Sequence, residues 1–200
     1  MHEMKRSIRA ATRSSRRAHS VSERQELTAS LTENLVTVVR RHSPDLMACY
    51  LSTPDEPNTR PFLEWAAAHS VDLLLPVSRP DGQLNWVRNH PGAETVGLYG
   101  IAERAGDVVH ESVIGTVDLM FVPAAAVDHS GMRLGWGKGY YDRTLAGLQR
   151  EPPVFAVIYD DELVDHLPRE EHDRPVGGVI TPTQIRTFGQ ASSGDPSRQT

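Results

Sequence analysis

Short apolar runs alternate with segments of helical periodicity along most of the chain beyond residue 44. Strands are predicted at 46–52, 71–78, 83–88, 117–123, 154–160 and 177–185, helices at 60–70, 140–148 and 161–168, and a loop-rich stretch at 97–109. Continuous apolar strands that alternate with helices indicate a mainly parallel sheet covered by helices on both faces. We therefore expect an α/β fold, a Rossmann-like three-layer sandwich, that binds ligands beyond the carboxyl ends of its strands.

The first 45 residues predict two helices of different character. Lys5, Arg9, Arg13 and Arg16 stand at i, i+4, i+8 and i+11, so a helix would align them in one basic stripe. Such a stripe is either a solvated face or a surface for a polyanion. In the next helix, apolar residues recur at helical spacing, namely Leu27, Leu31, Leu35, Val38 and Val39. Ser22 and Gln25 predict a capping box at its start.

Composition and charge restrict the classes of protein that fit. The chain has 200 residues, 38% of them hydrophobic and 24% charged, with one cysteine. We expect a single domain over residues 1–188 and a disordered polar tail at 189–200, without disulfides or a structural metal. The net charge of −5 disfavours binding of nucleic acid by the whole surface. No run approaches the roughly 18 apolar residues of a membrane span. The expected protein is cytoplasmic, a monomer or weak homo-oligomer, and binds neither nucleic acid nor membranes.

The segment 132–145, MRLGWGKGYYDRTL, has the strongest chemical pattern in the chain. Gly135, Gly137 and Gly139 alternate directly before a predicted helix. A glycine-rich loop that leads into a helix exposes backbone N–H groups at the positive end of the helix dipole, which suits phosphate. The alternative is a glycine turn that serves packing alone.

Two known phosphate-binding patterns match this segment incompletely. A Walker A loop requires a hydroxyl residue after the lysine, and here Gly139 follows Lys138. A dinucleotide fingerprint would place its third small residue at Tyr140, although Asp160 and Asp161 stand about 20 residues further on, where that fingerprint needs an acid. A nicotinamide-dependent oxidoreductase therefore stays open, as does a nucleic-acid-binding module that uses the basic N-terminus.

Charged side chains around the glycines fit a bound phosphate chain. Arg133 and Lys138 would bring two positive charges to it, and Arg143 a third from slightly deeper. Phosphates would repel Asp142 unless a divalent cation lay between them. Asp142 is therefore either a magnesium ligand or an acid favoured by the dipole in the first turn of a helix.

The segment GMRLGWGKGYYD at 131–142 resembles the signature of the 5-formyltetrahydrofolate cyclo-ligase family, G-x-RLG-x-G-x-GYYD. The resemblance extends to Lys5 and Arg9, to LSTPDEPNT at 51–59, and to LPREEHD at 167–173 with GGVITPT at 177–183. It implies ATP-dependent cyclisation of 5-formyltetrahydrofolate to 5,10-methenyltetrahydrofolate with release of ADP and phosphate. Phosphorylation of the formyl oxygen would give an iminium phosphate, which N10 of the folate attacks.

The resemblance also implies which residues contact ATP and magnesium. Lys5 and Arg9 are expected to contact ATP from the first helix. The triphosphate is expected to be wrapped by Arg133, Leu134, Gly135, Trp136, Gly137, Lys138, Gly139, Tyr140 and Tyr141, of which Lys138, Arg133 and Tyr140 are the candidate catalytic residues. Asp142 and Asp173 are expected to hold Mg²⁺. Gly177 stands where similar proteins often carry an acid, which would alter part of the metal or nucleotide shell.

The folate site implied by the resemblance follows the first strand. It consists of Leu51, Glu56, Trp136 and Tyr140. A carboxylate at Glu56 suits the hydrogen-bond donors of a 2-amino-4-oxopterin. Leu51 and the two aromatic residues would supply apolar contacts to the folate.

Overall fold

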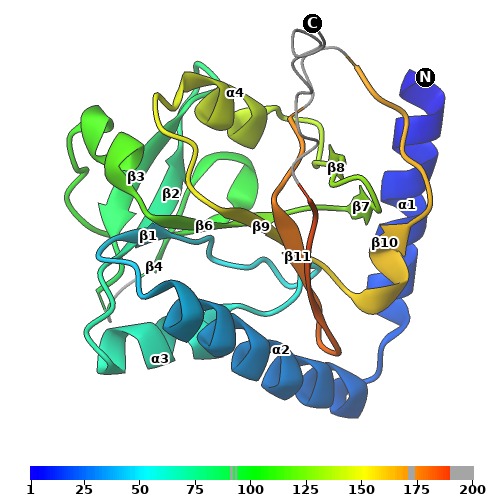
Figure 1. Cartoon of the computed structure of the whole chain (residues 1–200), viewed down its shortest axis with the longest axis horizontal. Coiled ribbons are helices and arrows are strands. Elements are labelled where there is room, and N and C mark those ends of the chain that lie inside the picture. The colour runs from blue at the N-terminus through cyan, green and yellow to red at the C-terminus, as the bar shows by residue number, and fades with distance from the viewer. Residues whose placement is uncertain (91, 93, 171–173, 190–200) are drawn as a thin grey trace, which may run out of the picture.

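The computed structural model describes residues 1–90, 92, 94–170 and 174–189. Its centre is a seven-stranded sheet with the order β12-β11-β9-β6-β1-β2-β3 (Figure 1). The strands are β1 (Met47–Ala48), β2 (Leu73–Ser78), β3 (Leu84–Arg88), β6 (Leu119–Pro123), β9 (Val154–Val157), β11 (Gly178–Ile180) and β12 (Ile185–Thr187). The five inner strands are parallel, and β3 and β12 pair antiparallel at the edges. The predicted mainly parallel sheet is thereby confirmed.

Helices cover both faces of this sheet because its strands are apolar on both sides. Leu119 and Phe121 of β6 pack toward α2 (Val21–His42) and α3 (Arg60–Ala68). Met120 and Val122 point to the opposite face, where α4 (Tyr140–Gly147) and the 3₁₀ helix η2 (Glu111–Thr116) pack. Side chains of successive strand residues point to opposite faces, so a strand between two helical layers needs apolar residues at every position.

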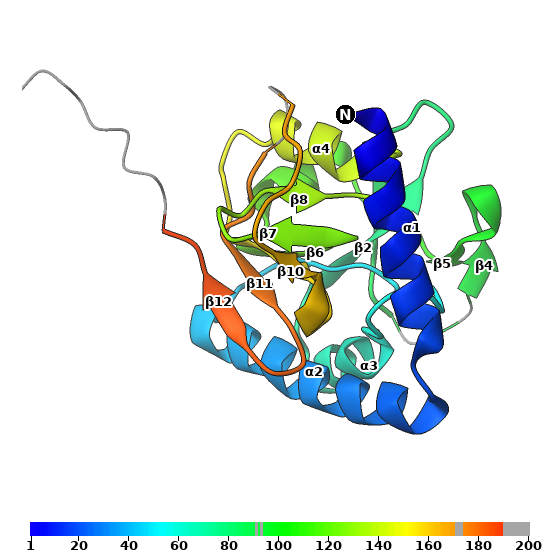
Figure 2. The same ribbon diagram turned by 90° about the vertical axis from the view of Figure 1, so that its right-hand side faces the viewer.

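Two smaller sheets complete the fold. In one, β7 (Ala126–Asp128) pairs with β8 (Arg133–Leu134) and with β10 (Leu163–Val164). In the other, β4 (Glu94–Val96) pairs with β5 (Ala102–Arg104), close to the 3₁₀ helix η1 (Leu98–Gly100). Helix α1 (His2–Ala18) lies beside the first of these sheets, and Figure 2 shows it crossing that side of the molecule. Thr12 Oγ1 donates a hydrogen bond of 3.1 Å to the carbonyl of Ala125 there. The small sheet therefore gives α1 a fixed position.

Three predictions of secondary structure are wrong. The predicted helix at 161–168 is instead the 3₁₀ helix η3 (Asp160–Glu162) followed by β10, because pairing with β7 outweighs local helical periodicity. The predicted strand at 177–185 is a hairpin of β11 and β12, whose turn is closed by the bond from Thr181 N to Gln184 O. The stretch 97–109 contains β5.

The start of α2 also differs from the prediction. Its capping box uses Ser20 and Glu23: Glu23 N donates to Ser20 Oγ, and Ser20 N donates to the Glu23 carboxylate. Ser22 and Gln25 lie within the helix. The box forms two residues earlier because α1 ends at Ala18 and only His19 separates it from the cap.

Residues 190–200, most of the predicted tail, lie outside the described part of the chain. No helix within the described part is long and apolar enough to span a bilayer.

Candidate active site

The predicted folate residues and most of the glycine segment line one pocket of about 150 Å³. It is bordered by Leu51, Glu56, Trp136 and Tyr140, all four of the predicted folate residues. Arg133, Gly135, Lys138, Gly139, Tyr141 and Asp142 line it as well. The ends of β2 and β6 contribute Ser78 and Pro123, so the pocket lies beyond the carboxyl ends of parallel strands, as expected for such a sheet. Its size suits a single ring system rather than a whole folate, since pockets for drug-sized ligands hold about 300–1,000 Å³.

Arginine side chains lie next to the positions that a Cβ atom would take at two of the alternating glycines. Gly137 has φ +91°, and a Cβ there would lie 3.4 Å from Cζ of Arg9. Gly139 has φ +69°, and a Cβ there would lie 2.7 Å from Nη1 of Arg143. Both backbone conformations are rare for residues with a side chain. Glycine is therefore favoured at both positions by the backbone conformation, whereas the neighbouring guanidinium groups are the ends of flexible side chains.

Helix α1 and the glycine segment are joined directly by Arg9, whose Nε donates a hydrogen bond of 2.7 Å to the carbonyl of Gly135. Burial and the neighbouring Arg13 lower the pKa of Arg9, while Asp142 and Glu170 oppose this. Lys5 is buried one helical turn earlier and pairs with Glu170 at 3.5 Å. The basic stripe therefore faces the protein through Lys5 and Arg9 rather than solvent, and it reaches the glycine segment.

Asp142, in α4, forms an ion pair with Arg133, which precedes that helix in the chain. The Arg133 side chain is 2% exposed, and its Nε is buried without a hydrogen-bond partner among the described residues. The Asp142 side chain is 32% exposed and borders the pocket, so it remains accessible to a ligand.

The residues at this site fit a magnesium–phosphate complex better than a metal held by protein alone. Across residues 1–90, 92, 94–170 and 174–189, no three His, Cys, Asp or Glu side chains gather closely enough to hold a metal. Magnesium is commonly bound by one or two carboxylates together with substrate phosphates. Asp142 lies beside Arg133 and Arg9, so the site holds one carboxylate next to two cations of the kind that bind phosphate. Asp173, the second predicted metal ligand, lies outside the described residues, and Gly177 does not line the pocket.

Glu56 is a half-buried carboxylate whose position is set by its own turn. The backbone N–H and the hydroxyl of Thr53 donate to Glu56 Oε2 at 2.9 and 3.0 Å. Burial raises the pKa of Glu56 from its ordinary value of 4.5, while the two Thr53 hydrogen bonds, the charge of Arg16 and the indole of Trp136 act in the opposite direction. The Glu56 carboxylate borders the pocket, where its oxygens can accept hydrogen bonds from a ligand.

Aromatic residues of the glycine segment bring polar groups into the same pocket. Within the described part of the chain, Tyr141 Oη is buried without a hydrogen-bond partner, whereas the Trp136 indole lies close enough to Glu56 to lower the pKa of that carboxyl. Tyr140 Oη donates to the carbonyl of Arg79 at 3.4 Å. A buried donor without an acceptor is costly, so the Tyr141 hydroxyl beside the pocket indicates a ligand that supplies an acceptor.

Other predicted residues are placed around this site. Leu134 is buried in β8 and packs with Ala125 and Leu167. Arg143 Nε and Nη2 donate to the carbonyls of Gly82 and Lys138 at 2.7 and 2.6 Å, so this guanidinium binds backbone between the β2–β3 turn and α4.

Two residues near the pocket were not singled out as site residues from the sequence. Glu103 on β5 is buried, lines the pocket and accepts a hydrogen bond of 2.7 Å from Ser78 N. It lies in a stretch expected to be a loop, and no sequence signal distinguished it. Arg16 is buried beneath Trp136, and its place on the basic stripe was the one signal that pointed to it.

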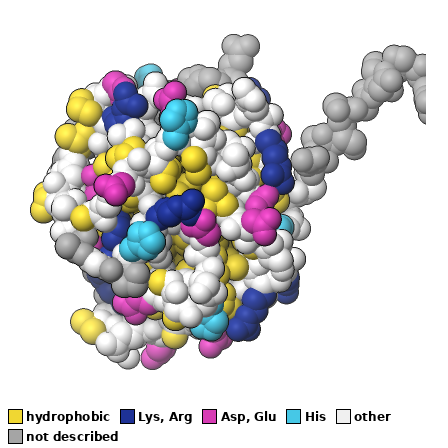
Figure 3. Space-filling model, turned by 90° about the vertical axis from the view of Figure 1, so that its left-hand side faces the viewer, with side chains coloured by type: hydrophobic (Ala, Val, Ile, Leu, Met, Phe, Trp, Pro, Cys, Tyr) yellow, Lys and Arg dark blue, Asp and Glu magenta, His cyan; other side chains and the backbone are white. Residues whose placement is uncertain are grey.

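The acidic pair needed for a dinucleotide site serves other contacts. Asp160 accepts hydrogen bonds from the hydroxyls of Thr181 and Thr183, and Asp161 accepts one from Ser15 at 2.9 Å. Neither lines the pocket. The nicotinamide-dependent alternative is thus not supported. Figure 3 shows the side of the molecule that carries β3 and β4, where basic and acidic side chains are interspersed rather than gathered into a basic surface.

Comparisons with known proteins agree on one family. The family model described as the 5-formyltetrahydrofolate cyclo-ligase family matches residues 1–182. A 5-formyltetrahydrofolate cyclo-ligase from Escherichia coli (strain K12) is 35% identical over 183 residues, covering 86% of this chain and 97% of that protein. One from Mycolicibacterium smegmatis is 37% identical over 141 residues, covering 68% and 73%. The solved 5,10-methenyltetrahydrofolate synthetase of Aquifex aeolicus superposes with a TM-score of 0.79 at 27% identity, covering 98% of this chain and 100% of that one.

Proposed function

The chain belongs to the 5-formyltetrahydrofolate cyclo-ligase family, and we propose that it converts 5-formyltetrahydrofolate to 5,10-methenyltetrahydrofolate with ATP, the pterin ring occupying the pocket described above and the triphosphate lying against the glycine segment that borders it. One observation carries this proposal. The residues expected to bind folate after β1 and those expected to bind ATP in the glycine segment border the same pocket, and Arg9 of α1 contacts that segment. The two substrates would then meet where the reaction requires them.

Cations around the glycine segment are proposed to bind the triphosphate. Arg9, Lys138 and Lys5 would contact phosphate oxygens, and Arg133 would stabilise charge at the transferred phosphoryl group. Asp142, together with Asp173, would hold magnesium, which supplies neutralising charge when bound. The Arg133–Asp142 ion pair supports this, because it places a buried cation and an accessible carboxylate side by side.

The folate is proposed to bind with its pterin against Glu56. The carboxylate would accept hydrogen bonds from the 2-amino group and ring N–H, while Leu51, Trp136 and Tyr140 pack against the ring. The unpartnered Tyr141 hydroxyl would donate to a substrate oxygen or nitrogen. These contacts would hold the formyl oxygen toward the phosphate-binding side of the pocket.

The proposed reaction has two bond-making steps. The formyl oxygen attacks the terminal phosphorus of ATP, which releases ADP and leaves an iminium phosphate. N10 then attacks the formyl carbon, loses its proton, and the phosphate departs to give the methenyl product. Both steps depend on alignment and charge stabilisation, which are the contributions that positioned cations and a fixed substrate can make. No protein nucleophile is needed.

Two features support the remaining expectations. Lys5, Arg9 and Arg16 of the basic stripe contact other parts of the protein, which favours a small-molecule role over nucleic-acid binding. Burial raises the pKa of Cys49 to about 12, so this cysteine is an unreactive core residue and fits the cytoplasmic location we propose.

A direct assay tests the proposed function. Formation of 5,10-methenyltetrahydrofolate is followed by its absorbance while 5-formyltetrahydrofolate, ATP and Mg²⁺ are omitted one at a time. We expect product only with all three present. Equal rates with Mg²⁺ chelated would remove the proposed metal role, and no product with the complete mixture would refute the function.

A further inference from the structure

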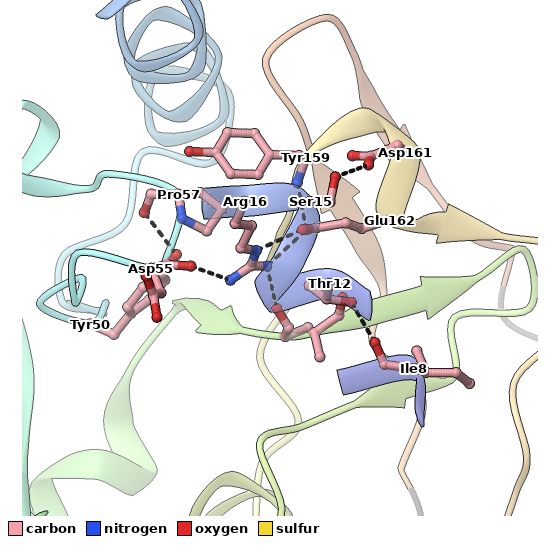
Figure 4. A network of polar contacts seen from close by, with 12 residues as sticks. Ile8, Thr12, Ser15, Arg16, Tyr50, Asp55, Pro57, Tyr159, Asp161 and Glu162 are labelled. Atoms are coloured by element: carbon pink, nitrogen blue, oxygen red, sulfur yellow. Dashed lines mark hydrogen bonds and ion pairs between the residues drawn. The ribbon is translucent and has the colours of Figure 1, made fainter. Parts of the chain in front are cut away.

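Arg16 is a buried cation in a network of polar contacts that includes Glu162 and Asp55 (Figure 4). It is 2% exposed. Its Nε and Nη2 donate to the two carboxylate oxygens of Glu162 at 2.6 and 2.7 Å. Nη2 also donates to the carbonyl of Ala124 at 2.8 Å, and Nη1 donates to that of Asp55 at 3.1 Å. One guanidinium therefore connects α1, η3, the chain after β6 and the turn that carries Glu56.

The geometry of this pair favours the charge of Arg16, while burial raises the pKa of Glu162 against the hydrogen bonds and charge of Arg16. Burial lowers the pKa of Arg16, but the hydrogen bonds and charge of Glu162 outweigh burial and raise it overall. Taking two charges out of water costs several kcal/mol per ion, and a buried ion pair often adds little net stability compared with apolar residues of similar size. A role in placing other groups is therefore a better explanation for the pair than stability.

Arg16 contacts the Trp136 ring of the proposed folate site and the backbone next to Glu56. The guanidinium carbon is 5.1 Å from the centre of the Trp136 ring. The Asp55 carbonyl that accepts from Nη1 belongs to the residue directly before Glu56. Arg16 thus contacts the backbone beside the pterin-binding carboxylate and the ring expected to pack on the pterin.

The charge of Arg16 also acts on Glu56 itself. Burial raises the pKa of Glu56, and Arg16 is the cation that opposes it. The other groups facing Glu56 are the Thr53 N–H and hydroxyl and the Trp136 indole, which also favour the anion, and the hydroxyls of Tyr50 and Tyr141. Burial keeps the pKa of both tyrosines well above the ordinary value, so they stay neutral as Glu56 titrates.

We propose that Arg16, held in place by Glu162, is a positioning residue that fixes the Glu56 turn and the Trp136 ring and keeps Glu56 ionised for folate binding. This inference rests on the proposed function, because it assigns the effect to folate recognition. A pair that merely fastened α1 to η3 would affect ATP and folate alike, and its effect would not depend on the protonation of Glu56.

The test uses the full-length protein and measures binding of 5-formyltetrahydrofolate without ATP, by calorimetry, across a range of pH. The main variant is the double substitution Arg16→Met/Glu162→Met, which removes both charges and keeps apolar volume in the core. Arg16→Lys keeps the charge and loses the two-pronged contact with Glu162. Arg17→Met is the matched control, because Arg17 pairs with the Asp55 carboxylate at 2.6 Å but is 66% exposed.

The double variant is expected to bind folate roughly 10- to 100-fold more weakly at neutral pH, the range of a lost charge-assisted interaction. Its affinity should recover as pH rises, since Glu56 without Arg16 ionises only at higher pH. Arg16→Lys should weaken folate binding but keep the pH profile of the wild type, and Arg17→Met should match the wild type. The KM for ATP should change much less than the folate affinity in the Arg16 variants, and in Arg17→Met it should match the wild type.

A loss in the double variant that is independent of pH, or that raises the KM for ATP equally, would overturn the proposal and leave Arg16 as a structural contact. Adding Glu56→Gln provides a second measurement: if Arg16 acts through Glu56, the combined loss is smaller than the sum of the separate losses, and additive losses contradict it. If the double variant does not fold, Arg16→Lys with and without Glu56→Gln supplies the same comparison. Failure of the wild type itself to bind 5-formyltetrahydrofolate would instead refute the proposed function.

Discussion

Replacement of Gly137 by valine tests the phosphate-binding role of the glycine segment most directly. Gly137 has φ +91°, where side chains are rarely tolerated, and its Cβ position lies 3.4 Å from the Arg9 guanidinium carbon. Holding valine in that conformation costs about 1–3 kcal/mol, toward the upper end because it is β-branched. If the segment moves to relieve the strain, it loses the hydrogen bond from Arg9 to Gly135, a charge-assisted contact of about 1.5–3 kcal/mol.

The two responses give different measurements. Retained strain lowers the melting temperature by roughly 2–12 °C, since 1 kcal/mol corresponds to about 2–4 °C for a chain of this size. A displaced segment lowers kcat/KM for ATP by roughly 10- to 100-fold with a smaller change in melting temperature. Thermal unfolding and steady-state kinetics on the same preparation therefore distinguish them.

Gly147→Val is the matched control for this substitution. Gly147 closes α4 and has an ordinary φ, and among the described residues nothing beyond its own helix and chain neighbours lies within 4 Å of its Cβ position. Valine is no worse than glycine in a helix, so stability and ATP use should both be preserved. An unchanged melting temperature together with normal ATP kinetics in Gly137→Val would refute the reasoning, and the phosphates would then bind elsewhere.

Arg9→Ala and Lys138→Ala should each lower kcat/KM for ATP by roughly 10- to 100-fold while thermal unfolding stays cooperative. Because both cations are proposed to contact one phosphate chain, the effect of the double variant should differ from the sum of the two single effects. Strict additivity would contradict a shared site. Burial raises the pKa of Glu56 above 4.5, so folate affinity should fall as pH drops through that raised value, at a higher pH than for an exposed glutamate. Glu56→Gln should remove this dependence and weaken folate binding more than ATP binding, as titration calorimetry across pH would show; a rise in the KM for ATP alone would count against the assignment. Asp142→Asn should raise the Mg²⁺ concentration needed for half-maximal rate, and an unchanged Mg²⁺ requirement would exclude Asp142 as a ligand.

The sequence by itself determined the layered architecture and the family. Strands between two helical layers need apolar residues on both faces, so runs such as 117–123 and 154–160 identified the inner strands of the sheet. The glycine segment was equally visible, because alternating glycines before a helix satisfy a local backbone requirement. In the structure, Gly137 and Gly139 meet this backbone requirement with positive φ. Patterns that arise from neighbouring residues could be read without the fold.

Only the tertiary structure decided which charged groups meet. Arg16 and Glu162 are separated by 146 residues, and no spacing in the sequence distinguishes Arg16 from Arg13 on the same stripe. Glu103 could not be identified from the sequence either, because it becomes a pocket residue only when β5 places it against Ser78. At residues 161–168, pairing with β7 overrides a helical pattern in the sequence. Such contacts depend on the relative positions of elements far apart in the chain. Burial then determines how strongly each charge acts, because a carboxylate and its cation attract each other more strongly in the core than at the surface, where water screens them.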